Sequence, residues 1–196
     1  MSYNKKNSDT CVRLGPVRFG YAHVFEPKID ENEAKAAAAA GREPKGKYST
    51  CIMIPKSDTD TIKMIEAAIE AAKQKGKTSK WGGKIPGRLS LPLRDGDEED
   101  KGEEYENMMF FNCSSSRKPG VCVWEDGKPV EALDEDDFYS GCWGAVAVNF
   151  YPFSANGNNG VGAGLNNVIK TRDDERLAGG STAEQDFADL ADDLLN

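Results

Sequence analysis

The stretch "YSGCWGAVAVNFYPFSANGNNGVGAGLNN", residues 139–167, decides the predicted fold of this chain. Its first half mixes small, β-branched and aromatic residues, which is typical of a strand. Successive side chains of a strand point to opposite faces, so Trp143 and Ala145 would share one face, and Val146 and Val148 the other. Both faces are apolar, and the strand is therefore predicted to be central in a sheet or to close a barrel.

The second half of this stretch, "SANGNNGVGAGLNN", is rich in glycine and asparagine. The run from Gly160 to Gly164 resembles a dinucleotide-binding turn, but that motif needs a following helix in a βαβ unit, and neither is predicted. We interpret the segment as a pliable loop at the mouth of a groove, after the last barrel strand, with glycines where the backbone needs positive φ. Tyr151 and Phe153 precede it as candidate platforms for stacking a base, and one of them is expected to be in the core.

The remaining segments predict a mainly β protein. Residues 57–76 have the apolar stripe of a helix, with Ser57 or Asp58 as its N-cap and Gly76 as its end. A shorter helix is predicted over 34–40. One good helix among many strands argues against a parallel βαβ architecture and favours an OB-fold-like β-barrel with one inserted α-helix. Further strands are predicted at 10–25 (as one strand or a bent pair broken at Gly15-Pro16), 46–54, 107–115, 120–125 and 128–133.

The acidic residues of the chain are concentrated in two segments. The 196 residues carry a formal net charge of -8. The loop at 95–106 and the end at 183–196 carry -7 and -5, so the rest of the chain carries +4. A basic body is compatible with a nucleic-acid partner, because local charge and not the total decides what a surface attracts. We predict a binding domain at 1–180, including the acidic loop 95–106, and a disordered acidic interaction tail at 181–196.

Composition and motifs narrow the class of protein. The five cysteines form no C-x-x-C pair and His23 is the one histidine, so we expect reduced, buried cysteines and no metal site. No apolar run approaches the roughly 20 residues of a membrane span, and the N-terminus lacks a secretory signal. These features predict a cytoplasmic protein, without a membrane or a cofactor. We find no catalytic residues.

The segment "KQKGKTSKWGGKIPGRLSLPLR", residues 73–94, is basic and contains no acid. Lysines and arginines that neutralise phosphates, interleaved with an aromatic ring that stacks on a base, are what a single-strand binder requires. The alternative is a solvated helix end with a partly packed Trp81. Other basic and aromatic residues fit the same hypothesis. The full set of candidate contacts to single-stranded DNA is Lys45, Lys47, Tyr48, Lys77, Lys80, Trp81, Lys84, Arg88, Arg117, Lys118, Trp124, Tyr151, Phe153, Lys170 and Arg172.

The C-terminal sequence "STAEQDFADLADDLLN" is acidic with a spaced apolar stripe. Such a segment can form an amphipathic helix on a partner protein, while its charge keeps it disordered when free. A plain helix packed on the domain is the alternative. The predicted partner-binding residues of this tail are Asp186, Phe187, Asp189, Leu190, Asp192 and Asp193.

The sequence also resembles a known family, the phage-encoded single-stranded DNA-binding proteins. The resemblance covers most of the chain and rests on residues 47–72, on residues 138–180 and on the terminal "AEQDFADL". It implies an OB-fold core, an acidic tail and binding of single-stranded DNA without sequence specificity in phage replication and recombination, in the host cytoplasm. Partners would be replication or recombination proteins that read the tail, and a homodimer is possible. Bacterial single-strand binders close their acidic tail with an aromatic residue, whereas Phe187 stands nine residues before the end, so the partner stays open.

Two other functions compete with this interpretation. An acidic protein that mimics DNA and inhibits a host enzyme would need carboxylates spread over a surface, and removing 95–106 and 183–196 would abolish its activity. A nuclease or recombination enzyme would use the carboxylates of Asp134–Asp137 with metal ions. Adjacent acids in one run mostly face water, so we interpret this run as a solvated turn or helix start before Phe138.

Overall fold

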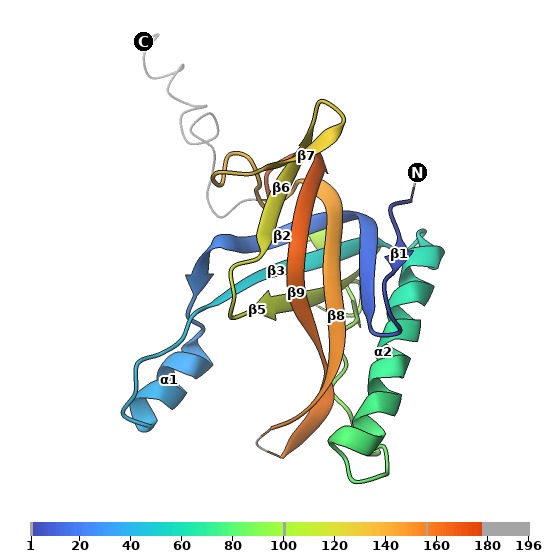
Figure 1. Ribbon diagram of the computed structural model, residues 1–196, viewed down its shortest axis with the longest axis vertical. Helices are drawn as coiled ribbons and strands as arrows, with labels where there is room; N and C mark the ends of the chain where they lie inside the picture. The colour runs from blue at the N-terminus through green and yellow to red at the C-terminus, as the bar shows by residue number, and fades with distance from the viewer. Residues whose placement is uncertain (1, 100, 156, 178–196) are drawn as a thin grey trace, which may run out of the picture.

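The computed structural model describes residues 2–99, 101–155 and 157–177 (Figure 1). The strands are β1 (Lys5–Lys6), β2 (Cys11–Lys28), β3 (Lys47–Pro55), β4 (Arg94–Asp95), β5 (Met108–Ser115), β6 (Gly120–Glu125), β7 (Lys128–Glu131), β8 (Trp143–Ala155) and β9 (Asn158–Arg172). The helices are α1 (Glu31–Ala39), α2 (Thr59–Ser79) and the short 3-10 helix η1 (Glu103–Tyr105). None of the helices within these ranges is long and apolar enough to cross a membrane.

Five of the strands close a barrel. The ladder runs β5-β3-β2-β8-β9 with antiparallel neighbours, and a parallel pairing of Ser114 in β5 with Gly164 in β9 joins its two ends. Inside it pack the alternating apolar residues of each strand, among them Leu14, Ile52 and Val146, all with an exposed fraction of 0%. The predicted mainly β, OB-fold-like barrel with a helix inserted between two of its strands is confirmed, and β8 is central, as its two apolar faces predict.

The glycine-asparagine segment is a strand and not a loop, so our prediction of a pliable loop at 154–167 was wrong. β8 and β9 form one long antiparallel hairpin, paired from Trp143–Arg172 to Ala155–Asn158. The turn at its tip contains Gly157, at a φ of 77°. Within β9, Val161 and Leu165 point into the core, while the alternate glycines point outward. Apolar residues alternate with glycines along β9, and their burial in the core outweighs the low strand propensity of glycine.

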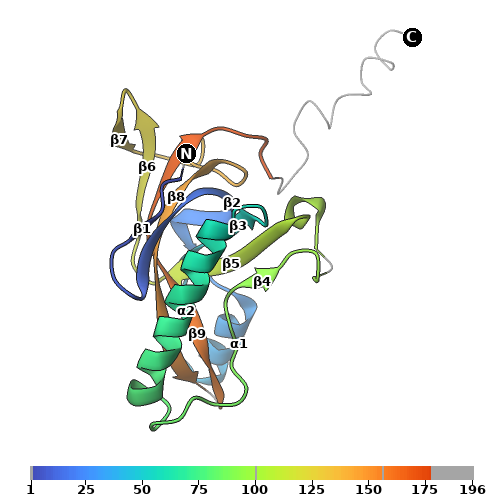
Figure 2. The ribbon, with the colours of Figure 1, turned by 90° about the vertical axis from the view of Figure 1, so that its right-hand side faces the viewer.

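The helix α2 lies along β8 and covers the core on that side (Figure 2). Asp58 caps it by accepting a hydrogen bond from the backbone N–H of Thr61 at 3.2 Å. The predicted end at Gly76 was wrong, because α2 continues to Ser79. A Cβ atom at Gly76 would lie 2.6 Å from Pro152, so glycine is needed there for close packing and not for a cap.

The acidic segment is folded onto the outside of the barrel. Cys51, Met53 and Phe110 project from the outer face of β3 and β5, and Tyr105 covers them to form a second apolar cluster. The rings of Tyr105 and Phe110 meet edge to face with centroids 4.8 Å apart. Burial raises the pKa of the Cys51 thiol to about 11. We refer to residues 94–107 as the acidic lid.

Three further comparisons with the predictions concern details. Of the two alternatives for residues 10–25, the single strand is confirmed: β2 is one strand, with a register shift between Leu14 and Val17. Cys51, Cys113 and Cys142 are buried, but Cys11 and Cys122 are only half-buried, so the expectation of five buried cysteines was partly wrong. The helix predicted over 34–40 begins earlier, at Glu31, because Asp30 caps it.

The last described residues, 173–177, are fixed to the barrel. Asp173 and Asp174 accept hydrogen bonds from the Tyr139 hydroxyl and from Nε1 of Trp143, at 2.8 and 2.7 Å. Leu177 packs against the second cluster. The predicted tail at 181–196 and its six candidate residues lie outside the described residues.

Candidate nucleic-acid interface

The outer face of the β8–β9 hairpin has a floor of glycines. The facing pairs are Asn149 with Gly164, Tyr151 with Gly162 and Phe153 with Gly160. A Cβ atom added to Gly162 would lie 2.8 Å from the Tyr151 ring, and one added to Gly160 would lie 2.8 Å from the Phe153 ring. Each ring therefore lies over the glycine opposite it. Tyr151 keeps 42% of its surface exposed, so the face presents a flat aromatic ring to solvent. We call this surface the glycine-floored face.

A first group of cations surrounds the tip of this hairpin. Nε1 of Trp81 donates a hydrogen bond to the Phe153 carbonyl at 3.2 Å, and Ser90 pairs with Gly160 as an isolated parallel bridge. These contacts hold the basic segment beside the tip. Four of its exposed cations form the tip cluster, Lys77, Lys80, Lys84 and Arg88. None of the four forms an ion pair with any residue that the structure describes.

A second group of cations lies where β3 begins and β5 ends. Tyr48 pairs with Ser115, and the neighbouring Ser114 pairs with Gly164 of the glycine-floored face. The exposed cations around this point form the strand-end cluster, Lys45, Lys47, Arg117 and Lys118. The glycine stripe of β9 thus lies between two groups of cations, one beside Gly160 and one beside Gly164. This arrangement suits an anionic strand that crosses the stripe.

Three other predicted residues lie away from the tip, on β9 and on its neighbour β6. Trp124 is on β6, which pairs with β9, and 53% of its surface is exposed. The guanidinium of Arg172 lies over the Trp143 ring at 4.8 Å. Lys170 is different, because its ammonium is 2.8 Å from Asp173, its side chain is 15% exposed and it lies over Tyr139. Hydrogen bonds from Lys170 and Tyr139 lower the pKa of Asp173, so Lys170 serves the fold of the C-terminal segment.

The predicted aromatic residues divide by exposure. Trp81 is half-buried against Gly76, with its indole N–H bonded, and it fixes the basic segment to the barrel. Tyr48 and Phe153 are half-buried as well. Tyr151 and Trp124 are the members of the predicted set with the largest exposed rings. Neither Tyr151 nor Phe153 belongs to the fully buried core, which instead takes Phe150 from this strand.

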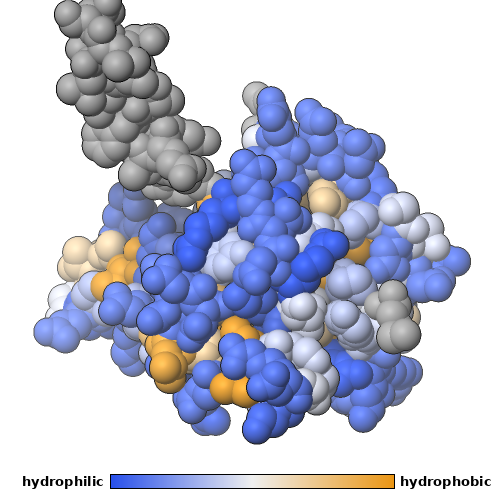
Figure 3. Space-filling view, turned by 90° about the horizontal axis from the view of Figure 1, so that it is seen from above, coloured by the Kyte–Doolittle hydropathy of each residue, from blue (hydrophilic) through white to orange (hydrophobic). Residues whose placement is uncertain are grey.

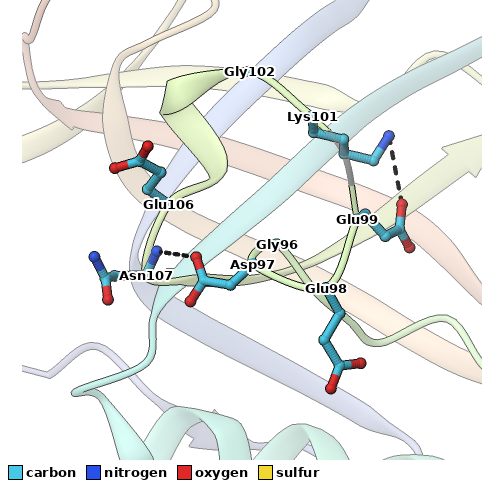
Figure 4. Close-up of a pocket in the computed structure, with 8 residues that line it drawn as sticks. All are labelled: Gly96, Asp97, Glu98, Glu99, Lys101, Gly102, Glu106 and Asn107. Carbon is cyan, nitrogen blue, oxygen red and sulfur yellow. Dashed lines mark hydrogen bonds and ion pairs between the residues drawn. The ribbon is translucent and has the colours of Figure 1, made fainter.

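Three carboxylates of the acidic lid, those of Asp95, Asp97 and Glu99, are paired with lysine or arginine side chains. Lys56 bridges Asp95 and Asp97, and hydrogen bonds from its ammonium lower the pKa of both carboxyl groups. Figure 4 shows Asp97 accepting a hydrogen bond from the backbone of Asn107, and the ion pair between Lys101 and Glu99. Among the described residues no group of three or more metal-ligating side chains converges. These acids therefore stabilise a loop on the barrel.

The run Asp134–Asp137 forms a turn, as we interpreted it. Oδ1 of Asp134 accepts hydrogen bonds from the backbone N–H groups of Asp136 and Asp137 at 3.0 and 3.3 Å. Phe138 follows as a fully buried residue. The end of the molecule seen in Figure 3 is mostly hydrophilic, with its hydrophobic residues in small separate patches. Carboxylates that cap their own turn are poorly placed to hold two metal ions.

Sequence reasoning missed the glycine-floored face itself. The signal was present: Gly160, Gly162 and Gly164 alternate with Val161, Ala163 and Leu165, which is the period of a strand with one bare face. We also did not single out Tyr3 and Arg13, which lie with Trp124 around one pocket. No local motif marks them, because β2 and β6 are connected only through the pairings of β2 with β8, β8 with β9 and β9 with β6.

Comparison with known proteins finds a matching family and similar structures. The family described as "Enterobacter phage Enc34, ssDNA-binding protein" matches residues 10–195. Protein p50 of Acyrthosiphon pisum secondary endosymbiont phage 1 is 30% identical, over 92% of this chain and 94% of its own length. The bacteriophage Enc34 single-stranded DNA-binding protein, solved in complex with ssDNA, is 25% identical with a TM-score of 0.69, covering 89% of this chain and 97% of its own.

A more distant structure shares only the fold. The single-stranded DNA-binding protein gp2.5 of bacteriophage T7 is 17% identical with a TM-score of 0.51, over 93% of this chain and 94% of its own. The family match covers nearly the whole chain and includes the barrel, the long hairpin and the acidic end. The resemblance noted in the sequence is thus confirmed, and the chain belongs to the Enc34 single-stranded DNA-binding protein family.

Proposed function

We propose that this protein binds single-stranded DNA without sequence specificity during phage DNA replication and recombination. The observation that carries the proposal is the open glycine-floored face, with an exposed Tyr151 ring and unpaired cations on both sides. Membership of the Enc34 family, whose Enc34 member was solved in complex with ssDNA, supports it.

The mechanism follows from what this face offers. Unpaired bases stack on exposed aromatic rings, at about 1–3 kcal/mol per base, and every base has a π-face, so sequence preference is slight. The glycines have no side chain, so the Tyr151 and Phe153 rings can lie against the strand backbone, and the exposed part of Tyr151 is available to a base. The tip cluster and the strand-end cluster neutralise phosphates. Duplex DNA binds poorly to such a face, because its bases are already stacked. The role is passive and requires no cofactor and no bond-breaking step.

Three finer parts of the proposal concern the rest of the protein. The acidic tail, with Phe187 and Leu190, recruits replication or recombination proteins and competes with DNA for the cationic face. Its site of action is the cytoplasm of the host cell. A homodimer, to be tested by sedimentation, would place two binding faces in one particle. Family membership supports the role in phage DNA metabolism, and the composition of the tail supports the recruitment of partners.

The decisive experiment is a titration of the full chain with oligo-dT and with a matched duplex, followed by tryptophan fluorescence. If about 4–6 phosphates are contacted, the slope of log K against log[salt] is about -3 to -4, since each contact contributes about 0.7 for single strands. Strong, salt-weakened binding of oligo-dT with weak binding of the duplex is the expected result. Equal affinity for both, or affinity independent of salt, would contradict the proposal.

A further inference from the structure

A pocket opens on the outer face of the hairpin, away from its tip. The hollow has a volume of about 530 Å³ and is lined by Tyr3, Arg13, Trp124, Pro129, Ala145 and Ile169, together with Thr171. Ala145 and Ile169 pair across β8 and β9 and form its floor. Trp124 and Pro129 pair across β6 and β7 and form one wall. We call this hollow the Trp124 pocket.

The pocket and the glycine-floored face lie on the same side of one hairpin. β8 has no extra residue between Gly144 and Ala155, so the side chains of Ala145, Asn149, Tyr151 and Phe153 share one face. Ala145 and Phe153 are eight residue steps apart along β8, which is about 26 Å at about 3.3 Å per step. A strand that leaves Tyr151 along the hairpin therefore arrives at Trp124 without changing face.

The groups that line the pocket have unused binding capacity. The indole of Trp124 is 53% exposed, and no hydrogen bond joins its N–H to any described residue. Arg13 donates from Nε to the Tyr3 carbonyl at 2.8 Å, and its two terminal nitrogens make no bond within the described part of the chain. A flat aromatic wall above an aliphatic floor accepts a planar ring, and a free guanidinium at the rim accepts an anion. A nucleotide supplies both in one unit.

We propose that the Trp124 pocket binds a nucleobase of single-stranded DNA, with Arg13 on the adjacent phosphate. The bound strand then runs along the outer face of the β8–β9 hairpin, from the tip cluster to β6. This inference rests on the proposed function and extends its site beyond the glycine-floored face. Glu125 and Asp126 lie at the turn after Trp124, so the strand ends at the pocket and does not continue over the β6–β7 turn.

The test compares two lengths of oligo-dT on the full chain. A short oligomer of about 5 nucleotides and a long one of about 15 lie at the two ends of the range of site sizes known for one OB-fold. Trp124→Ala is expected to lower affinity for the long oligomer about 5- to 100-fold and to change the short one far less. Trp124→Phe keeps an aromatic ring and should therefore retain most of the affinity for the long oligomer. Arg13→Gln should reduce the salt slope for the long oligomer by about 0.7.

Controls separate this inference from the proposed function. Leu133→Ala changes an 81% exposed residue outside the pocket and should bind like the unmodified protein. If Tyr151→Ala lowers affinity but Trp124→Ala leaves both oligomers unchanged, the pocket is not a DNA site and the proposed function stands. If Trp124→Ala tightens both equally, a competing protein segment occupies the pocket, which overturns the inference. If the unmodified protein binds neither oligomer, the proposed function itself fails.

Discussion

Two outer faces of the same barrel differ in whether another part of the chain covers them. On β3 and β5, the outward residues Cys51, Met53 and Phe110 are apolar, and the acidic lid buries them under Tyr105. On β8 and β9, the outward glycines lie under the side chains of Asn149, Tyr151 and Phe153, and Tyr151 keeps 42% of its surface exposed. The first face is closed by protein and the second is open.

The difference shows how a barrel reserves one face for a ligand. An apolar face must be covered, because exposed apolar area is unfavourable in water. The glycines of the β8–β9 face contribute little apolar area, so this face can stay exposed to water until a ligand with aromatic rings binds to it. The charges agree with this division. Carboxylates pair with Lys56 and Lys101 around the covered face, and unpaired lysines and arginines surround the open one.

The largest expected effect is a loss of stability when the covered face is uncovered. Tyr105→Ala removes a ring with 4% exposure from the second cluster and should lower the free energy of unfolding by about 3–5 kcal/mol. Denaturant unfolding measures it. Tyr105→Phe keeps the ring and loses the hydroxyl that meets Sγ of Cys51 at 3.7 Å, so it should lose far less. An unchanged stability of Tyr105→Ala would mean that the acidic lid does not hold this face.

The next effect is on the open face and concerns DNA and not stability. Tyr151→Ala should weaken oligo-dT binding by about 1–3 kcal/mol, because a stacking ring is lost. Its unfolding midpoint in urea should stay close to that of the unmodified protein, since the ring is 42% exposed. The comparison fails if Tyr151→Ala loses stability and keeps its affinity.

A glycine substitution sharpens the same point. Gly162→Ala places a Cβ atom 2.8 Å from the Tyr151 ring and must displace that ring, so oligo-dT binding should weaken, by less than in Tyr151→Ala. Gly87→Ala is the matched control, because nothing lies within 4 Å of its added Cβ atom. Both are measured by the same titration. Equal affinities of the two variants would exclude a role for the glycine floor.

A smaller effect tests the charges around the open face. Arg88→Gln should reduce the slope of log K against log[salt] by about 0.7, because one phosphate contact is lost. Lys73→Gln serves as a control, since Lys73 is on the same basic segment but is paired with Glu70 at 3.2 Å. A slope that drops equally in both variants would point to a general field and not to a contact at the tip.

The smallest effect is the response of the acidic lid to pH. Hydrogen bonds from Lys56 hold the pKa values of Asp95 and Asp97 below their ordinary value in the folded protein. This stabilisation is complete above the unfolded pKa of about 4 and is lost as the pH falls through the lower folded values. The urea midpoints of the unmodified protein and of Lys56→Met should therefore differ at pH 7 and converge in acid. A gap that persists in acid would assign the effect to packing.

The lid also changes how the DNA-mimic alternative should be tested. Deleting residues 95–106 would remove Tyr105 from the second cluster, so loss of function would report unfolding and not loss of acidic charge. Neutralising the exposed Glu98 and Glu103 leaves that ring in place. A DNA mimic would then lose its activity, whereas a single-strand binder would keep its affinity for oligo-dT.

The sequence by itself determined the class of fold and the distribution of charge along the chain. Alternation in Trp143–Phe150 predicts a central strand, the apolar stripe of α2 predicts its helix, and the counts of acids in two segments predict a basic body. These features are local, because strand and helix periods are set by the backbone itself. The period-two glycines of β9 were equally local, and we did not identify them as a strand because glycine disfavours strands in isolation.

Only the tertiary structure decided which residues meet. Three pairs of residues that are far apart in the chain come together in the folded protein. They are Trp81 with Phe153, Ser90 with Gly160, and Arg13 with Trp124. Whether a residue such as Lys170 is free for DNA or paired within the fold depends on a partner, here Asp173, that its spacing does not reveal. The Coulomb and packing terms that settle such questions depend on distance in space and not on separation in sequence. Thus the sequence determines the strands, the helices and the distribution of charge, and the closed barrel determines which face remains open.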